Sequence, residues 1–354
     1  QGEARLFAGG TGEIEKRFSI PAAARNGIAG DEEIYWGYIA RYRGILLGTA
    51  TKSDAAYTKW WGKSQWFDTP TGGDTHVVAG DSLFALDAVT GQAAWTYQGL
   101  VLHPTITILD NRIYFIESKT AEHLKQSTRR LSIDKGQQLE LVCLDPANGK
   151  TVFRRELPSF KGKVTVLYLA GGGNRELRSL VLVASEATQK AFSVSCLDPS
   201  AGKVKWNRNV RWETNHHGKH ISRPAIENDL LYLRPEVLKL SDGATLKRGF
   251  PSGHGCASYT LSKNGLFSRL GETTWWDVRN DKVNRFSRVR TDCWISAIPA
   301  QGMLLSAEGG GGCSCGSWLE TAIGFLPRKI DQTFPLAEGS GDSASQEPGS
   351  KDRE

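Results

Sequence analysis

The sequence predicts an all-β fold and, within that class, a β-propeller built of four-stranded blades. The composition is the first indication, because 39 Gly, 11 Trp and a single Met in 354 residues are typical of many short strands joined by tight turns. The second is a hairpin that recurs along the chain. The third is that another hairpin precedes nearly every copy of the first. Helix is expected to be the minority state.

The recurring hairpin has one template. An apolar strand ends at Leu-Asp, a short turn closes on Gly, and the second strand reaches an aromatic residue. Asp can accept hydrogen bonds from the turn amides and Gly supplies a positive φ, which predicts a tight β-hairpin. The clear copies are LFALDAVTGQAAW (83–95), LVCLDPANGKTVF (141–153) and SVSCLDPSAGKVKW (193–206), and fainter ones lie at 6–18, 237–248 and 274–286.

A strand, small turn, strand unit lies before each of these hairpins except the first. Six such units in a chain of this length predict six four-stranded modules after a leading half, so we expect about seven blades, with six or eight as alternatives. One propeller domain is expected over 1–335. The segment 336–354 has five acids, two bases and no aromatic residue, so we expect it to be disordered.

The segments LDAVTGQAAW, LDPANGKTVF and LDPSAGKVKW resemble the repeat of the PQQ-type β-propellers, the superfamily of the quinoprotein alcohol dehydrogenases and the outer-membrane assembly lipoproteins. The resemblance covers roughly residues 5–330 and implies the fold more than a function. The segment 255–327 resembles the C-terminal part of large secreted PQQ-repeat proteins of planctomycete bacteria. That resemblance implies a periplasmic or secreted protein and further domains upstream in the same polypeptide.

Charge and hydropathy exclude several classes of protein. No stretch approaches the roughly twenty apolar residues that span a bilayer, so no transmembrane segment is expected. The net charge is +6, and because the basic residues are scattered along the sequence, we do not expect nucleic acid as a partner.

Propeller topology brings distant residues to one mouth of the central channel, because the first strand of every blade lines that channel. An aromatic, His or Cys residue stands at the start of five of the six first strands. The loop at 308–318 and the loop NHHGKH reach the same mouth. The candidate residues are therefore Trp36, His103, His216, His217, His220, Cys256, Cys293, Cys313 and Cys315.

The chemistry of these residues leaves several alternatives open. Four clustered cysteines in a secreted protein favour disulfides, for example Cys256 to Cys293. A metal site is the second interpretation, because Cys256, Cys293, Cys313 and Cys315 with His216, His217 and His220 have the right ligand types. Free buried thiols are the third. For Cys143 and Cys196 we expect a role as small core residues.

An aromatic insertion at 52–75 is expected to rise at the same mouth. Trp60, Trp61 and Trp66 there could stack on a sugar or a planar cofactor. The alternative is a loop held down by its own aromatic side chains. With Trp36 and His103, these three residues are the candidate ligand-binding set.

The function we favour is an extracytoplasmic module that binds a small molecule, a sugar or a protein at this mouth. One alternative is a PQQ-dependent oxidoreductase with Ca²⁺, but the sequence has no adjacent Cys-Cys pair, no CxxCH haem motif, and no motif that assigns the calcium ligands or the catalytic Asp. The other is an assembly scaffold like the outer-membrane propellers. We therefore favour a binding module over an enzyme.

Overall fold

The computed structural model describes residues 2–8, 10–25, 33–52, 55, 77–126, 128–213, 222–251, 259–263, 265–269, 272–287, 289, 296–300, 302–306 and 322–326. Nearly all of its regular structure is antiparallel strand. The named helices are a few residues long: η1 (Ala22–Arg25), η3 (His103–Thr105) and α1 (Ala121–Lys125). Over the described residues, none is long and apolar enough to cross a membrane.

The first three blades are built mostly of strands of six residues or more. Blade A comprises β3 (Ile34–Tyr42), β4 (Ile45–Lys52), β5 (Val77–Asp87) and β6 (Ala93–Leu102). Blade B comprises β7 (Thr107–Leu109), β8 (Arg112–Ser118), β10 (Leu139–Leu144) and β11 (Thr151–Glu156). Blade C comprises β12 (Val164–Gly172), β13 (Ser179–Glu186), β14 (Ala191–Leu197) and β15 (Val204–Arg211).

The later blades have strands of three to five residues. Blade D comprises β16 (Ala225–Glu227), β17 (Leu230–Leu233), β18 (Glu236–Lys239) and β19 (Thr245–Arg248). Blade E comprises β20 (Tyr259–Ser262), β21 (Gly265–Arg269), β22 (Thr273–Asp277) and β23 (Lys282–Phe286). The strands described for blade F are β24 (Ile298–Ala300), β25 (Met303–Ser306) and β26 (Ile323–Phe325).

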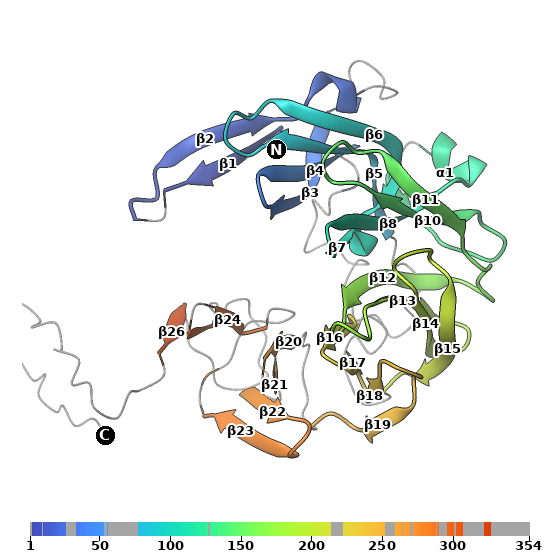
Figure 1. Cartoon of the computed structure of the whole chain (residues 1–354), viewed down its shortest axis with the longest axis vertical. Helices are drawn as coiled ribbons and strands as arrows, with labels where there is room; N and C mark the ends of the chain where they lie inside the picture. The colour runs from blue at the N-terminus through green and yellow to red at the C-terminus, as the bar shows by residue number, and fades with distance from the viewer. Residues whose placement is uncertain are drawn as a thin grey trace, which may run out of the picture.

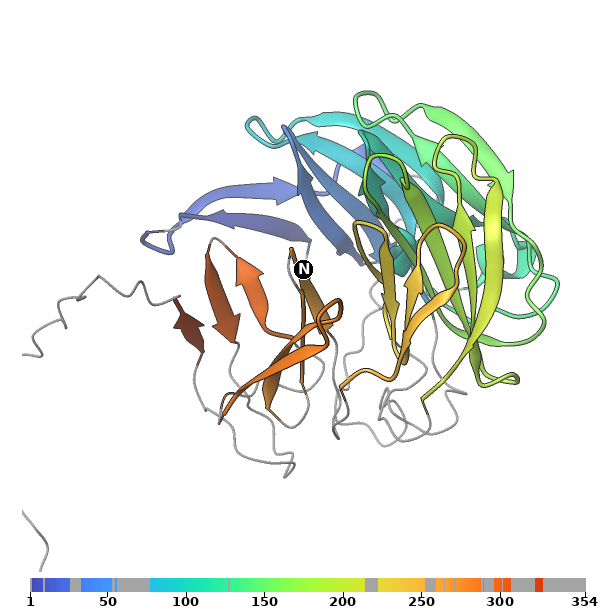
Figure 2. The same ribbon diagram turned by 60° about the horizontal axis from the view of Figure 1, so that its bottom comes forward.

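The blades follow one another around an arc, and their first strands face its centre (Figure 1). Contacts between the first strands of successive blades run from β7 to β12, β16, β20 and β24. The fold is therefore a β-propeller, as the hairpin repeat predicted. A separate hairpin of β1 (Glu3–Phe7) and β2 (Ile14–Ser19) precedes blade A in the chain and lies beside it at the end of the arc (Figures 1 and 2).

The turn chemistry agrees with the sequence prediction. Gly91, Gly149 and Gly202 have φ between +66° and +79°, a region that a residue with a Cβ atom rarely adopts. In the first turn, the Asp87 carboxylate accepts the amides of Val89 and Thr90. These bonds with Thr90 and Val89 hold the pKa of Asp87 below its usual value. The Asp and the Gly thus fix the turn together.

Blades A and B are joined in one nine-stranded sheet, which the repeat did not predict. The end of β6 stays paired with β5 and also pairs with β8, with Leu100 opposite Ser118 and Val101 opposite Glu117. This pairing is possible because β7 pairs only with Arg112–Tyr114 of β8 and leaves the last residues of β8 to β6. The first two blades therefore cannot separate without breaking backbone hydrogen bonds.

The fourth strands of blades A, B, C and D each contact the turn of the next blade through one side chain, at what we call the docking position. Trp95 on β6 lies against Gly149, where an added Cβ atom would be 2.6 Å from the indole, and its Nε1 donates to the carbonyl oxygen of Pro146 at 2.8 Å. Trp206 on β15 repeats this arrangement on Gly243 and Leu240 in blade D. The turn glycine thus serves the neighbouring blade as well as its own turn.

The same position identifies the hairpin β1–β2. Lys16 on β2 donates its ammonium to the carbonyl oxygen of Val89 in the turn of blade A, and Phe18 lies beside Gly91. These are contacts that a fourth strand makes with the following blade. The hairpin β1–β2 is therefore the outer half of a blade that precedes blade A.

Candidate functional site: the channel mouth

We define the mouth as the end of the propeller where the first strands begin and the second strands finish. His103 stands there, directly before β7, and the insertion 119–138 follows β8 at the same end. Blades A and B contribute these two features, and the starts of β12 and β16 and the ends of β13 and β17 bring blades C and D to the same end.

His103 occupies a space that exists because two neighbouring residues lack side chains. A Cβ atom on Gly37 of β3 would lie 2.2 Å from its Cε1, and one on Gly80 of β5 would lie 2.9 Å from its Nε2. Thr49 of β4 completes the surroundings with an Oγ1···Nε2 hydrogen bond of 2.8 Å. Three strands of blade A thus hold a histidine that belongs to the start of blade B.

His103 is a neutral imidazole at physiological pH. Burial lowers its pKa to about 4, because a charged ring would lose its hydration there. No carboxylate contributes to this shift. A neutral imidazole has one N–H donor and one nitrogen lone pair, so it can donate a hydrogen bond to a ligand or accept one from it.

Trp36 does not lie with His103. Its ring packs on the opposite face of blade A, over Gly48 and at 4.9 Å from the ring centre of Phe84 in an edge-on contact. The side chains of consecutive strand residues point to opposite faces, so the space at Gly37 and the ring of Trp36 are on different sides of β3. The Nε1 of Trp36 is buried and finds no hydrogen-bond partner in the described part of the chain.

The insertion 119–138 is fastened to blade A by backbone and charge. Its strand β9 (Arg130–Leu131) pairs with the beginning of β5. The Arg129 side chain, 7% exposed, donates from Nε and Nη2 to Asp81, the shorter contact being 2.6 Å, and from Nη1 to the carbonyl oxygens of His123 and Gln126. The insertion is therefore part of the rigid body of the propeller.

A buried histidine holds the other end of the insertion. His123 on α1 is 1% exposed, with Nδ1 at 2.8 Å from the Ser118 hydroxyl and Nε2 at 3.0 Å from the carbonyl oxygen of Ser132. Burial lowers its pKa, in the same direction as that of His103. Ser118 is fully buried, so this Ser-His pair faces no substrate and acts as an anchor.

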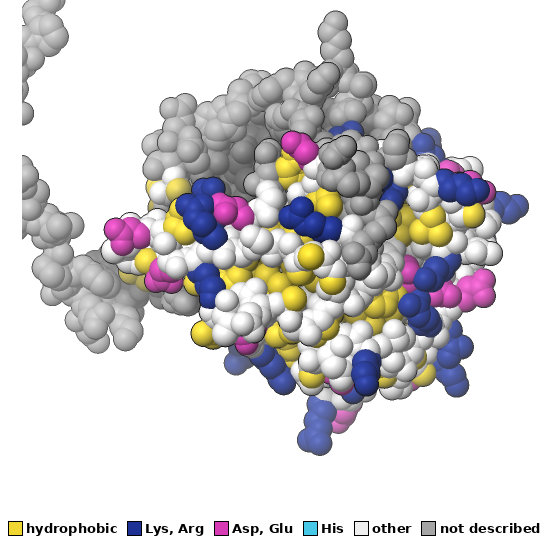
Figure 3. All heavy atoms as spheres, turned by 90° about the horizontal axis from the view of Figure 1, so that it is seen from above, with side chains coloured by type: hydrophobic (Ala, Val, Ile, Leu, Met, Phe, Trp, Pro, Cys, Tyr) yellow, Lys and Arg dark blue, Asp and Glu magenta, His cyan; other side chains and the backbone are white. Residues whose placement is uncertain are grey.

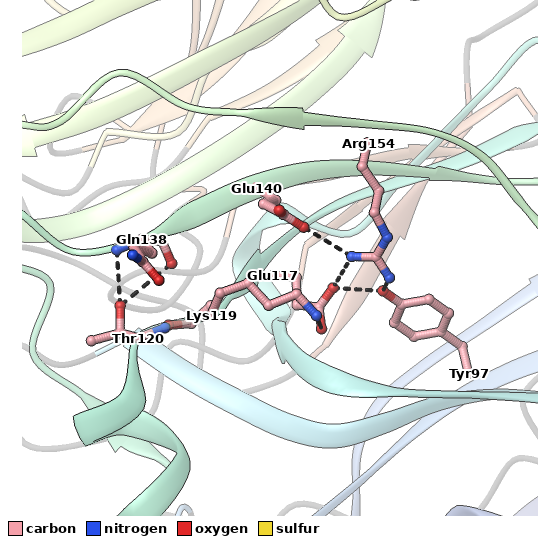
Figure 4. A network of polar contacts seen from close by, with 8 residues as sticks. Tyr97, Glu117, Lys119, Thr120, Gln138, Glu140 and Arg154 are labelled. Carbon is pink, nitrogen blue, oxygen red and sulfur yellow. Dashed lines mark hydrogen bonds and ion pairs between the residues drawn. The ribbon is translucent and has the colours of Figure 1, made fainter.

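A buried carboxylate joins blades A and B behind the mouth (Figure 4). Glu117, 1% exposed, accepts from Tyr97 and Arg154 at 2.6 Å each and from Lys119 at 2.5 Å. Arg154 also pairs with Glu140 at 2.9 Å. Burial and the hydrogen bond to Glu117 raise the pKa of Tyr97 far above its usual value. The network is closed by its own partners, so it fastens the junction of β6 and β8 and offers no open site.

Most residues predicted for the mouth lie outside the described residues. Of that set the structure places only Trp36 and His103, on opposite faces of blade A, and their ligand-binding role stays a prediction. The described residues contain no group of three His, Cys, Asp or Glu side chains that could hold a metal ion. The predicted residues whose surroundings are not described are Trp60, Trp61, Trp66, His216, His217, His220, Cys256, Cys293, Cys313 and Cys315.

Sequence reasoning missed the residues that build the surroundings of His103 and the anchors of the insertion. Gly37 and Gly80 were the available signal, since a glycine within a strand often marks the close approach of another group. Nothing in the sequence distinguished Glu117 or Asp81 from ordinary surface acids. Cys143 and Cys196 are buried free thiols, in agreement with the core role predicted for them.

The surroundings of His103 do not fit Ca²⁺, the ion that accompanies PQQ in the oxidoreductase alternative. Calcium requires several oxygen ligands, usually including carboxylates. The groups around His103 are one hydroxyl and two glycines, and no carboxylate acts on its titration. We therefore derive no step of quinone chemistry from the residues around His103.

No family model matches this sequence, and no curated protein matches it. Among solved structures it is similar to BamB from Moraxella catarrhalis, at 13% identity and a TM-score of 0.43, covering 84% of this chain and 74% of that one. It is also similar to a europium-containing methanol dehydrogenase, at 12% identity and a TM-score of 0.45, covering 86% and 69%. A third is the quinohemoprotein alcohol dehydrogenase ADHIIG from Pseudomonas putida HK5, at 11% and 0.36, covering 88% and 43%. At these identities no activity or partner is transferred from them, and the β-propeller fold rests on the blades described above.

Proposed function

We propose that this chain is an extracytoplasmic β-propeller module that binds a small molecule, a sugar or a protein at the mouth of its central channel. The observation that carries the proposal is the insertion 119–138. The equivalent connection of blade D is the dipeptide between β17 and β18, whereas blade B has a long insertion anchored by Arg129 and His123. A rigid scaffold that presents a fixed loop is a common basis of recognition.

His103 gives this mouth a defined polar group. It is neutral, held by Thr49, and lies at the start of the first strand of blade B. Such a group orients a ligand without demanding a charged one. The extracytoplasmic setting rests on the PQQ-repeat resemblance of the sequence.

The first test is native mass spectrometry of the unreduced protein, purified without chelators, followed by calorimetry with the bound species. The variant is His103→Gln, and the matched control is Val89→Ala, an exposed position in a turn at the opposite end of blade A. We expect His103→Gln to weaken binding at least about tenfold. The control should bind like the wild type, and both variants should unfold near the wild-type temperature.

Other outcomes would favour the alternatives. A bound quinone with calcium, together with alcohol-dependent dye reduction, would support the oxidoreductase. A stable protein complex that His103→Gln leaves intact would support the scaffold. Equal ligand affinity in the wild type and His103→Gln would contradict a binding site at this part of the mouth.

A further inference from the structure

Positive charge is concentrated on the outermost strands of the propeller. The fourth strands β2, β11, β15, β19 and β23 together carry eleven Lys or Arg and two Glu, a net charge of +9, whereas the whole chain carries +6. The third strands, β1, β5, β10, β14, β18, β22 and β26, carry two bases and six acids. The bias recurs in successive blades, so it belongs to the architecture of the outer wall.

Part of this charge is already neutralised inside the fold. Four bases of these strands pair with carboxylates of the same or the next blade: Arg17 with Glu3, Arg154 with Glu117 and Glu140, Arg208 with Glu236, and Lys247 with Asp281. Six exposed bases have no carboxylate partner among the residues that the structure describes: Arg155, Lys205, Arg211, Arg248, Lys282 and Arg285.

Four of the six form a series, one from each of four consecutive blades. Arg155, Arg211, Arg248 and Arg285 lie in the second half of β11, β15, β19 and β23. The Asp residues of the hairpin turns are at the other end of these strands, away from the series. These strands follow the outside of the arc (Figure 1). On the side of the molecule that carries blades A and B, Lys and Arg side chains project from the surface, with some Asp and Glu among them (Figure 3). We call these four residues the arginine band.

We propose that the arginine band binds a linear acidic polysaccharide that wraps part of the outer wall. Guanidinium groups pair with carboxylate or sulfate in a bidentate manner, which suits a polymer with one anionic group on each of several sugars.

Two other polyanions suit this wall less well. Single-stranded nucleic acid binds by stacking its bases on exposed aromatic side chains. The aromatic residues at the docking position, Trp95, Phe153 and Trp206, are instead packed against the glycine of the next blade. Duplex DNA is stiff and resists a small radius of curvature. A flat membrane can touch only one sector of a convex wall. The arginine band lies at the same end of the propeller as the mouth, but on the outermost strands and not on the first strands that line the channel, so it does not depend on the role proposed for His103.

The test is the affinity of the full chain for polygalacturonate at about 50 mM salt, compared with neutral dextran and with a single-stranded oligothymidylate. The band variant replaces each of the four arginines: Arg155→Gln, Arg211→Gln, Arg248→Gln and Arg285→Gln. The control variant removes the same charge from exposed positions off the fourth strands and outside the insertion 119–138: Arg41→Gln, Lys150→Gln, Arg175→Gln and Lys239→Gln.

We expect the wild type and the control variant to bind polygalacturonate and not dextran, with an affinity that falls as salt increases. The band variant should bind about tenfold or more weakly and with a weaker dependence on salt. Equal affinity of the band and control variants would overturn the proposal, as would no binding by the wild type at low salt. Tighter binding of oligothymidylate than of polygalacturonate would assign the wall to nucleic acid instead.

Discussion

Blades A to C and blades D to F have the same strand order, but they differ in strand length and in the residues at the docking position. In blade C all eight residues of β13 are buried, and Trp95 and Trp206 hold the following blades from the docking position. In blade D the strands have three or four residues, and Lys247 occupies the docking position, where it pairs with Asp281 of blade E at 2.5 Å. At the docking position, one side chain thus sets whether the turn of the next blade is held by a packed indole or by a solvated ion pair. The rest of the interface between blades D and E is a buried apolar cluster that includes Tyr232, Phe250 and Trp276.

The physical difference between these interfaces is large. A buried indole contributes a large apolar area and a hydrogen bond that water cannot replace. A surface ion pair contributes little, because both ions lose hydration and mobility on pairing. We therefore expect the docking contact to hold the turn of blade E more weakly than it holds the turns of blades B and D.

The largest expected effect is at the interface between blades A and B. Trp95→Ala should destabilise the protein by about 3–5 kcal/mol, since it leaves a cavity and an unpaired Pro146 carbonyl. Denaturant unfolding measures this loss. Trp95→Phe is the control that keeps a ring, as at Phe153 on β11, and it should cost clearly less. Similar losses for both variants would contradict packing as the cause.

The glycine that receives Trp95 is the next most sensitive position. Gly149→Ala combines a positive φ of +69° with a Cβ atom 2.6 Å from the indole, and should cost about 2–3 kcal/mol. Gly12→Ala is the matched control, because its φ is +72° with no atom within 4 Å of the added Cβ. It should cost only about 1 kcal/mol. Equal thermal shifts would show that the contact with Trp95 adds nothing.

Acidification should lower the stability of the early blades, because it protonates His103. Its pKa is about 4 in the folded protein and higher in the unfolded chain, so the unfolded state takes up the proton first. This contribution to stability is complete above about pH 6.5 and is lost as the pH falls toward 4. His103→Gln should remove about 1–2 kcal/mol of the pH dependence in this window. Parallel unfolding curves against pH for the two proteins would contradict the shift.

The smallest effect is expected at the ion pair between blades D and E. Lys247→Ala should cost less than about 1 kcal/mol, because Lys247 and Asp281 are both partly exposed, and added salt should reduce even this difference. A loss comparable to that of Trp95→Ala in thermal unfolding would remove the distinction between the two kinds of interface.

Local periodicity predicted the hairpins well, because each turn depends on residues within a few positions of one another. The turns at Asp87 to Gly91 and at Asp198 to Gly202 follow from Asp and Gly alone. The contacts at the docking position could not be predicted from local sequence. Trp95 and Pro146 are 51 residues apart in the chain, and only the packing of blade A against blade B brings them together.

The mouth was predicted less completely. Aligning strand starts placed Trp36 and His103 in one register, but it did not resolve which face each side chain takes, and the alternation along β3 separates them. The basic residues looked scattered because each blade contributes only a few of them. Their convergence on the outer wall is a property of the repeat in space.

Hydrogen–deuterium exchange of the native protein tests the comparison of the two regions most directly. The amides of β10 and β11, which form the hairpin that receives Trp95, should exchange far more slowly than those of β22 and β23, which form the hairpin that receives Lys247. Equal protection of the two hairpins, or faster exchange in β10 and β11, would contradict the account.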